Sequence, residues 1–213
     1  MHFYGYYRSS SSYRMRIALN LKGLAPEQTF IHLRKGDQFG ADYVKLNPQQ
    51  QVPTLITDDG DTLVQSPAIL EWLEETWPQP PLLPPDPIGR QRVRAIAAAI
   101  GCDIHPLGNL RVLQYVRKEF GQDEDGAFAW ARHWVELGFT GIEAMLAGDG
   151  RTGRYCHGDA PTLADLYLVP QVFNSGRFGV DMSKFPTIGR IHEACNELDA
   201  FANAAPGVQP DAE

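Results

Sequence analysis

The sequence predicts a small α/β domain followed by an all-helical domain, joined by a stiff connector. Strand-like and helix-like hydrophobic patterns alternate in the first third of the chain, and beyond it the strand-like pattern almost disappears. Between the two parts, residues 77–87 read Trp-Pro-Gln-Pro-Pro-Leu-Leu-Pro-Pro-Asp-Pro. Because prolines lack a backbone donor and stop helices, this stretch is expected to be extended and rigid. We therefore expect domains at 1–80 and 90–213, with a linker at 81–89.

The order of elements follows from the periodicity. Residues 2–7 predict a strand, and residues 12–22 predict a helix that Gly23 ends as its C′ residue. The later elements of the first domain are expected to be strands at 28–33, 54–57 and 62–65 and helices at 39–46 and 67–76. The second domain is expected to have helices at 90–120, 127–146, 163–172 and 188–202.

Composition excludes several classes of protein. The net charge of −7 argues against a general nucleic-acid or anionic-membrane binder, and no dense run of Lys and Arg is present. No apolar stretch reaches the roughly eighteen residues of a membrane span, and a secretory leader is not expected. Three cysteines without a close pair fit reduced thiols in a cytoplasm, and their spacing predicts no metal site.

A block of hydroxyls, Ser9 to Ser12, stands between the first strand and the first helix, with Arg8 before it. Hydroxyl side chains cap helices, and the free N–H groups of a helix start favour negative charge. Such a turn suits an anion, and it lowers the pKa of a thiol placed there. The chain's own cysteines lie far away in sequence, so a thiolate here is expected on a small molecule. A plain helix cap or a flexible surface turn is the alternative for this segment alone.

Two further features of the first domain point to a peptide ligand. A cis bond between Val52 and Pro53 would turn the Val52 N–H and C=O outward as a free strand edge, where an extended peptide could pair. Gln65 and Ser66 open a helix whose free N–H groups suit a carboxylate. Each feature alone also fits an ordinary turn or capped helix. Together they describe a site for a short, extended, acidic peptide that carries a thiol.

These motifs resemble the zeta class of the cytosolic glutathione transferases across nearly the whole chain. The resemblance rests on Arg8–Leu19, on the Gln-Val-Pro-Thr text ending at Thr54, and on the Gln65-Ser66 pair. It implies a thioredoxin-like N-terminal domain and a helical C-terminal domain of the glutathione-transferase type. The class includes the glutathione-dependent maleylacetoacetate and maleylpyruvate isomerases of aromatic-acid and tyrosine breakdown.

The second domain carries the same resemblance. The segment from Cys102 to Arg111 is similar to the isomerase segment, and Arg177-Phe178 with Val180-Asp181 is similar to the zeta pattern. Thr162 to Asp165 matches the family's helix-opening capping box, a fold element. One departure is Ser11, where many zeta proteins have Cys. It leaves open whether Ser9, Ser10 or Ser11 contacts the glutathione sulfur, and it puts in doubt side activities that need that thiol.

The resemblance assigns roles to residues. Reversible addition of the glutathione thiolate to a cis double bond permits rotation, and the enzyme must lower the thiol pKa and stabilise the oxyanion that develops. The expected catalytic residues are Arg8, Ser9, Ser10 and Ser11. Glutathione is expected to contact Gln51, Val52, Gln65, Ser66, His105 and Asn109, although His105 could equally be a structural histidine. Planar arginine side chains match carboxylates, and Arg8, Arg111 and Arg177 are expected to converge on one cleft around the dicarboxylate substrate.

Alternatives remain open. The chain could be a glutathione transferase that conjugates or dehalogenates small 2-halo acids, or a non-catalytic glutathione-binding module. Maleylacetoacetate and maleylpyruvate differ only in the keto-acid tail, which one sequence does not resolve. Family resemblance implies a homodimer, and the reduced cysteines fit a cytoplasmic location. Arg14 and Arg16 are expected on the helix surface or in structural ion pairs.

Overall fold

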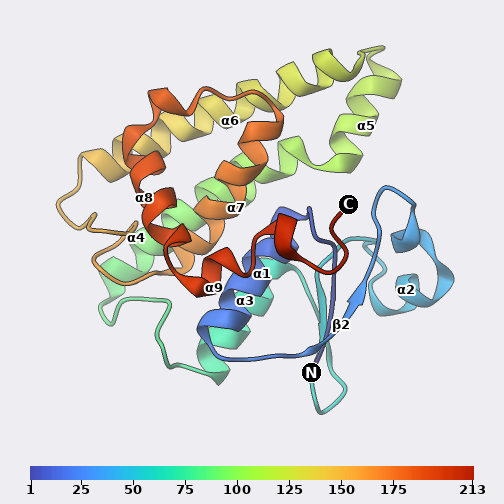
Figure 1. Cartoon of the computed structure of the whole chain (residues 1–213), viewed down its shortest axis with the longest axis horizontal. Helices are drawn as coiled ribbons and strands as arrows, with labels where there is room; N and C mark the ends of the chain where they lie inside the picture. The colour runs from blue at the N-terminus through green and yellow to red at the C-terminus, as the bar shows by residue number, and fades with distance from the viewer. The chain divides into compact units, whose positions relative to one another are not determined.

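The computed structural model describes all 213 residues, which divide into two compact units. Unit 1 comprises Met1–Pro81 together with Glu197–Glu213, and unit 2 comprises Leu82–Asn196. The last segment of the chain therefore packs with the N-terminal residues, whereas the sequence analysis places it in the helical domain (Figure 1). None of the helices combines the length and apolar character that a membrane crossing requires.

Unit 1 is built on a four-stranded mixed sheet in the order β2-β1-β3-β4. Its strands are β1 (His2–Gly5), β2 (Glu27–Phe30), β3 (Thr54–Ile56) and β4 (Thr62–Val64). β1 runs parallel to β2 and antiparallel to β3, and β4 is an antiparallel edge strand. All four predicted strands are present, and β1 and β2 are shorter than expected.

The first three helices of unit 1 lie close to their predicted ranges, and the fourth is one piece of the helix expected over 188–202. They are α1 (Ser10–Leu21), α2 (Ala41–Leu46), α3 (Ser66–Thr76) and the short α9 (Asp199–Ala202), with 3-10 turns η1 (Asp37–Phe39) and η5 (Pro206–Val208). α1 packs against both α3 and α9, and α9 lies beside α1 in Figure 1. Gly23 follows α1 at φ 68°, a left-handed conformation in which glycine is favoured.

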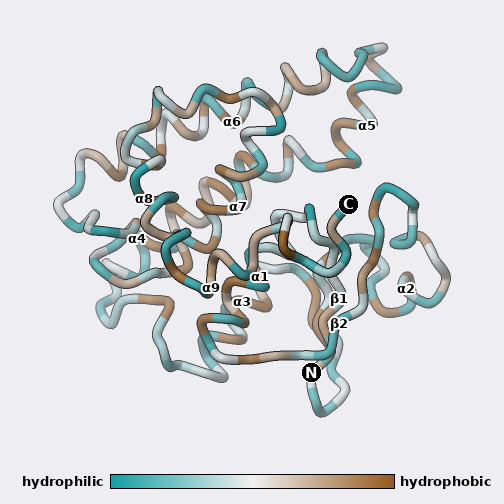
Figure 2. The backbone as a smooth tube through the Cα atoms, in the orientation of Figure 1, coloured by the Kyte–Doolittle hydropathy of each residue, from teal (hydrophilic) through white to brown (hydrophobic).

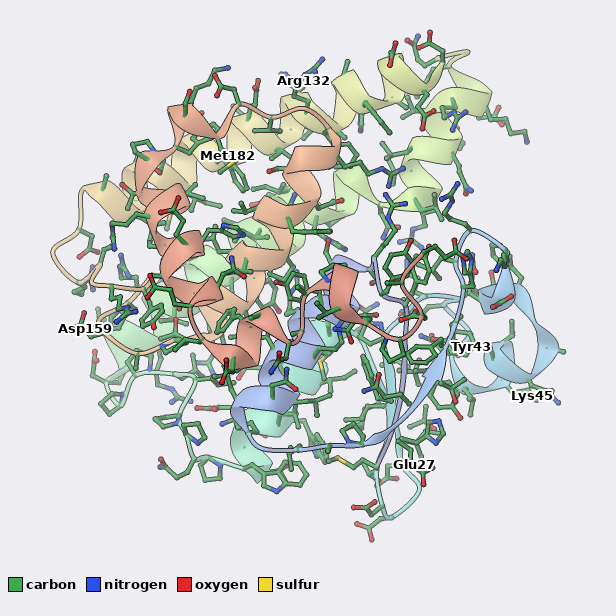
Figure 3. All side chains as sticks on the ribbon, viewed as in Figure 1. Glu27, Tyr43, Lys45, Arg132, Asp159 and Met182 are labelled. Carbon is green, nitrogen blue, oxygen red and sulfur yellow. The ribbon has the colours of Figure 1, made fainter.

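Buried aromatic side chains fill the end of the sheet from which β1 leads into α1. Tyr6, Tyr7, Ile31, Tyr43 and Val52 form one buried cluster, called the aromatic cluster here. Tyr43 comes from α2, whose exposed Lys45 points away into solvent (Figure 3). The cluster therefore joins four segments of unit 1: the turn after β1, the end of β2, α2 and the loop before β3.

Unit 2 is helical, and its first predicted helix is interrupted. In place of one helix over 90–120, the chain forms α4 (Pro87–Ala98), a π-helical turn η2 (Ala99–Ile104), a 3-10 turn η3 (His105–Gly108) and α5 (Leu110–Glu119). The single-helix prediction is wrong because Pro106 lacks an N–H and crowds the preceding turn. Asn109 is extended at ψ 147°, and α5 starts anew after it.

The remaining helices are α6 (Glu124–Ala147), α7 (Leu163–Arg177) and α8 (Pro186–Asn196), with a 3-10 turn η4 (Met182–Lys184). The capping box of Thr162 and Asp165 at the start of α7 is confirmed, and α7 continues through Pro170 beyond its predicted end. The predicted helix over 188–202 is two helices, because Leu198 is extended at ψ 129°. Hydrophobic and hydrophilic stretches alternate along α6 (Figure 2), and buried apolar residues of α4, α6, α7 and α8 form the core of unit 2.

Candidate functional site

The hydroxyl block forms a helix-capping turn with distinct roles for its serines. Ser9 is the N-cap of α1, and its Oγ accepts a hydrogen bond of 3.2 Å from the Ser12 N–H. Ser12 is fully buried, and its Oγ accepts from the Tyr6 N–H at 3.2 Å. Ser9 is half-buried and its oxygen is held by α1, so the hydroxyl proton remains to be donated elsewhere. Ser10, at the first helical position, is 7% exposed.

The bond between Val52 and Pro53 is cis, which is the conformation that the expected strand edge at Val52 requires. The loop before it is held at one oxygen, the Gln51 carbonyl, which accepts from Tyr43 Oη at 2.6 Å and from Asn47 Nδ2 at 2.8 Å. Val52 lies just before β3 and outside the ladder that begins at Thr54. A peptide edge therefore stands next to the aromatic cluster, to which Val52 itself belongs.

Gln65 and Ser66 open α3, as predicted, with a strained backbone. Gln65 has φ 69°, a conformation that residues other than glycine rarely adopt and that occurs at ligand-binding sites. Its side chain donates to Gln49 Oε1. Ser66 is 3% exposed, and Pro67 follows in the first turn of the helix. The first N–H groups of α3 have no carbonyl of a preceding turn to bind and favour an anion.

Arg14 and Arg16 do not lie on the helix surface, which corrects that expectation. They are 2% and 6% exposed. Arg14 Nη1 donates to Ser66 Oγ at 3.0 Å, so a buried cation on α1 supports the start of α3. Their neighbours Met15 and Ile17 are also fully buried, because α1 is enclosed on nearly every side. Because α1 is buried nearly all round, polar residues in its pattern do not mark an exposed face, and the burial of both arginines could not be predicted from it.

The electrostatics of the turn favour an anion. Arg8 is half-buried and makes no hydrogen bond or ion pair with the protein, so its guanidinium is available to a ligand. Burial raises the pKa of Tyr6 to about 12, and the charges of Arg8 and Arg34 oppose this rise. Arg34 is exposed, and its proximity to Tyr6 was not apparent from its sequence position. Two arginines therefore stand near the tyrosine that precedes the serine turn.

The candidate residues of unit 2 gather at one end of that unit. His105 begins η3, Asn109 follows it, and Arg111 lies in the first turn of α5. The exposed Arg177 ends α7, and its guanidinium carbon lies 5.2 Å from the centre of the Phe128 ring and 5.8 Å from that of Phe178. Gly108 approaches the same Phe178 ring, and Trp130 Nε1 donates to Leu107 O at 3.0 Å. Contacts through Phe178 and α6 thus connect the end of α7 with η3.

Two of the chain's three cysteines, Cys156 and Cys195, are buried and provide no reactive thiolate. All three cysteines are free. Burial, with the nearby Asp165 carboxylate, raises the pKa of Cys156 and of Cys195. Both stay protonated and pack in the core of unit 2 around Asp165, which accepts from the Cys156 N–H at 2.8 Å. The exposed Cys102 lies in η2.

Comparisons with known proteins cover the whole chain. Residues 8–76 match the family model of the glutathione S-transferase N-terminal domain. The chain is 54% identical over 211 residues to a maleylpyruvate isomerase of Ralstonia sp, covering 99% of each chain.

Solved structures of similar proteins match the fold of this chain over its whole length. One is the holo structure of a maleyl pyruvate isomerase, a bacterial zeta-class glutathione S-transferase, with 53% identity, a TM-score of 0.98 and complete coverage of both chains. Another is a maleylacetoacetate isomerase of Methylobacterium extorquens AM1 that binds malonate and glutathione. It has 42% identity, a TM-score of 0.97 and complete coverage of both chains.

Proposed function

The chain belongs to the zeta class of the glutathione transferases, and from this membership we propose that it isomerises maleylacetoacetate or maleylpyruvate with glutathione as cofactor. Unit 1 has the thioredoxin-like fold of the class, and unit 2 has its helical fold. The similarity to isomerases over the full chain carries the proposal and favours it over a dehalogenating transferase or a binding module. In the Methylobacterium relative, glutathione and a dicarboxylate are bound together.

The residues of unit 1 fit glutathione, a short acidic peptide with a thiol. We assign the cysteinyl backbone of glutathione to the Val52 peptide groups, since an extended peptide pairs with a strand edge. The γ-glutamyl carboxylate is assigned to Gln65 and Ser66, with the buried Arg14 behind them. Gln51 is assigned to the glycyl end. His105 and Asn109 are proposed as further glutathione contacts on the family resemblance.

When bound, glutathione supplies the thiol whose reversible addition to the double bond permits rotation about it. Among Ser9, Ser10 and Ser11, we assign the hydrogen bond to sulfur to Ser9. Its oxygen already accepts from the Ser12 N–H, so its own proton is directed away from α1. The start of α1 and the charge of Arg8 stabilise the thiolate, as they do any anion placed there.

The substrate carboxylates need permanent positive charge in a protein whose net charge is −7. We propose that Arg8, Arg111 and Arg177 bind them, because a guanidinium pairs with a carboxylate through two parallel hydrogen bonds. The rings of Phe128 and Phe178 hold the Arg177 head by cation–π contact. Such support orients the guanidinium without neutralising its charge.

A spectrophotometric assay tests the function. The purified protein is expected to isomerise maleylacetoacetate, maleylpyruvate or both when glutathione is added, with glutathione recovered unchanged. Stoichiometric loss of glutathione would support conjugation. Absence of turnover of both acids, with glutathione still bound, would support a binding module. A rate independent of glutathione would overturn the cofactor assignment.

We also propose that the protein is a cytoplasmic homodimer. A pocket of about 170 Å³ lies between the edge strand β4 and α3, lined by Leu63, Val64, Ile69 and Trp72 among others. An edge strand with an apolar pocket suits a second copy of the chain. Free cysteines suit a reducing compartment. A sedimentation mass near the 23.7 kDa of one chain at micromolar concentration would contradict the dimer, and cell fractionation tests the location.

A further inference from the structure

The backbone of Tyr6 and Tyr7, immediately before Arg8 and Ser9, is held at all four of its polar groups. The Tyr6 N–H donates to Ser12 Oγ, and the Tyr6 carbonyl accepts from the Ser9 N–H at 3.1 Å. The other two groups depend on partners further along the chain. The Tyr7 carbonyl accepts from Arg16, and the Tyr7 N–H donates to Asp211.

Arg16 joins this backbone to the last segment of the chain. Its Nη2 donates to the Tyr7 carbonyl at 2.9 Å, its Nη1 lies 3.5 Å from the Tyr6 carbonyl, and its Nε donates to the Ala204 carbonyl at 2.9 Å. Burial lowers the pKa of Arg16 to about 10, while Asp211 and Tyr13 oppose this effect. Its charge is thus kept in the interior by three carbonyls and a nearby carboxylate.

Asp211 supplies the last contact. Its Oδ2 accepts from the Tyr7 N–H at 2.9 Å, across 204 residues of sequence. Its Oδ1 is buried and has no hydrogen-bond partner in the protein, so the attraction of Arg16 compensates its charge. Nearby, Asn20 Nδ2 donates to the Ala200 carbonyl at 3.0 Å, which ties α9 to α1. The segment from α9 to Asp211 is therefore anchored at several points along α1 and the turn before it.

We propose that Arg16 and Asp211 are positioning residues that fix the Tyr6–Tyr7 backbone and thereby direct the Ser9 hydroxyl toward the glutathione sulfur. The effect on sulfur rests on the proposed function, whereas the hold on the backbone does not. A hydroxyl that stabilises a thiolate must be held to within a fraction of an ångström, and a small displacement weakens it strongly. Loss of Asp211 also leaves a buried N–H unpaired, which favours movement of the Tyr7 peptide.

The test compares three variants of the full chain. Asp211→Ala removes the acceptor, Asp211→Asn keeps an oxygen that can accept from Tyr7, and Glu213→Gln is the matched control. Glu213 lies two residues away and pairs only with His32 and Lys35 on the surface. The readouts are the pH titration of bound glutathione by thiolate absorbance, kcat/KM against pH, glutathione affinity and the thermal unfolding midpoint.

In Asp211→Ala, the pKa of the bound thiol is expected to rise and kcat/KM below that pKa to fall about tenfold. Glutathione affinity measured with the protonated thiol is expected to stay within about twofold, because Val52 and Ser66 are untouched. Asp211→Asn is expected to restore most of the thiol pKa, and Glu213→Gln to match the unsubstituted protein. If Asp211→Ala does not fold, Arg16→Lys replaces it. Lysine keeps the positive charge but cannot donate to the Tyr7 and Ala204 carbonyls at the same time, so the pKa of the bound thiol is expected to rise in this variant too.

A lower unfolding midpoint with an unchanged thiol pKa in these variants would overturn the proposal and leave a purely structural role. The thiol titration needs no substrate. A shifted thiol pKa in a protein that isomerises neither acid would therefore refute the proposed function and support the positioning role.

Discussion

Arg14 Nη1 donates a 3.0 Å hydrogen bond to Ser66 Oγ, and both side chains are buried. The bond joins the middle of α1, which the serine turn opens, to the start of α3, where the γ-glutamyl carboxylate is assigned. Arg14 lies five residues after Ser9 on the same helix. One buried cation therefore joins the helix that the serine turn opens to the start of α3, and a carboxylate at Ser66 gains from its charge.

Replacing Ser66 by Ala is expected to weaken glutathione binding by about 1.5–3 kcal/mol, because a hydrogen bond to a charged group is lost. Isothermal titration calorimetry measures the change directly. The exposed Ser183 of η4 provides a matched control, and Ser183→Ala is expected to bind glutathione normally. Unchanged affinity in Ser66→Ala would remove this serine from the site.

Ser9→Ala is expected to raise the pKa of bound glutathione and to lower kcat/KM by roughly a hundredfold, since one oxyanion donor is removed. Ser10→Ala and Ser11→Ala are expected to have smaller effects, because the cap formed by Ser9 and Ser12 remains. Thiolate absorbance against pH measures the first quantity. A larger shift in either of the other two variants would transfer the assignment to that serine.

Arg111→Ala and Arg177→Ala are each expected to lower isomerase kcat/KM at least about tenfold, or about 1.4 kcal/mol of transition-state stabilisation. Glutathione affinity is expected to change little, because these residues are assigned to the substrate. Arg117→Ala, on the exposed side of α5, controls for the loss of one positive charge. Wild-type kinetics in both variants would mean that these arginines only cover the surface of unit 2.

The stability of the protein is expected to fall as the pH drops below about 6.5, in part through His192. Burial lowers the pKa of His192 from its usual 6.5, against the weaker opposing charge of Glu193. As the pH falls, His192 of the unfolded chain therefore takes up a proton before His192 of the folded chain does. Its contribution to stability is fully present above the pKa of the unfolded state and is lost as the pH falls toward the pKa of the folded state. Asn196 Nδ2 lies 3.1 Å from His192 Nε2, and donation to that nitrogen requires the neutral ring.

Thermal unfolding midpoints at about pH 7.5 and about pH 5.5 measure this dependence. The midpoint of His192→Gln is expected to fall less between the higher and the lower pH than that of the original protein. Its midpoint at the higher pH reports the cost of altered packing alone. An equal loss in the variant and the original protein would assign the acid sensitivity to other groups.

Four features were predictable from local sequence alone: the α/β-then-helical order, the serine cap, the turn at Val52–Pro53 and the capping box at Thr162. Each depends on a few neighbouring residues, so local pattern and turn chemistry are sufficient to predict it. Pro106 was a local sign that the helix predicted over 90–120 is interrupted. We overlooked it because the apolar residues on both sides of Pro106 follow a helical period.

The partners of the long-range contacts became known only from the folded structure. Asp211 reaches Tyr7 across 204 residues, and Arg14 reaches Ser66 across 52. Hydrophobic periodicity indicates which face of a helix is buried. It does not indicate which distant polar group forms a hydrogen bond with a polar residue on that face. Arg16 follows Met15 and precedes Ile17, so its sequence neighbours do not explain its burial. The folded structure does, because its guanidinium donates to the carbonyls of Tyr7 and Ala204. Such contacts arise from the packing of distant segments, which no local pattern encodes.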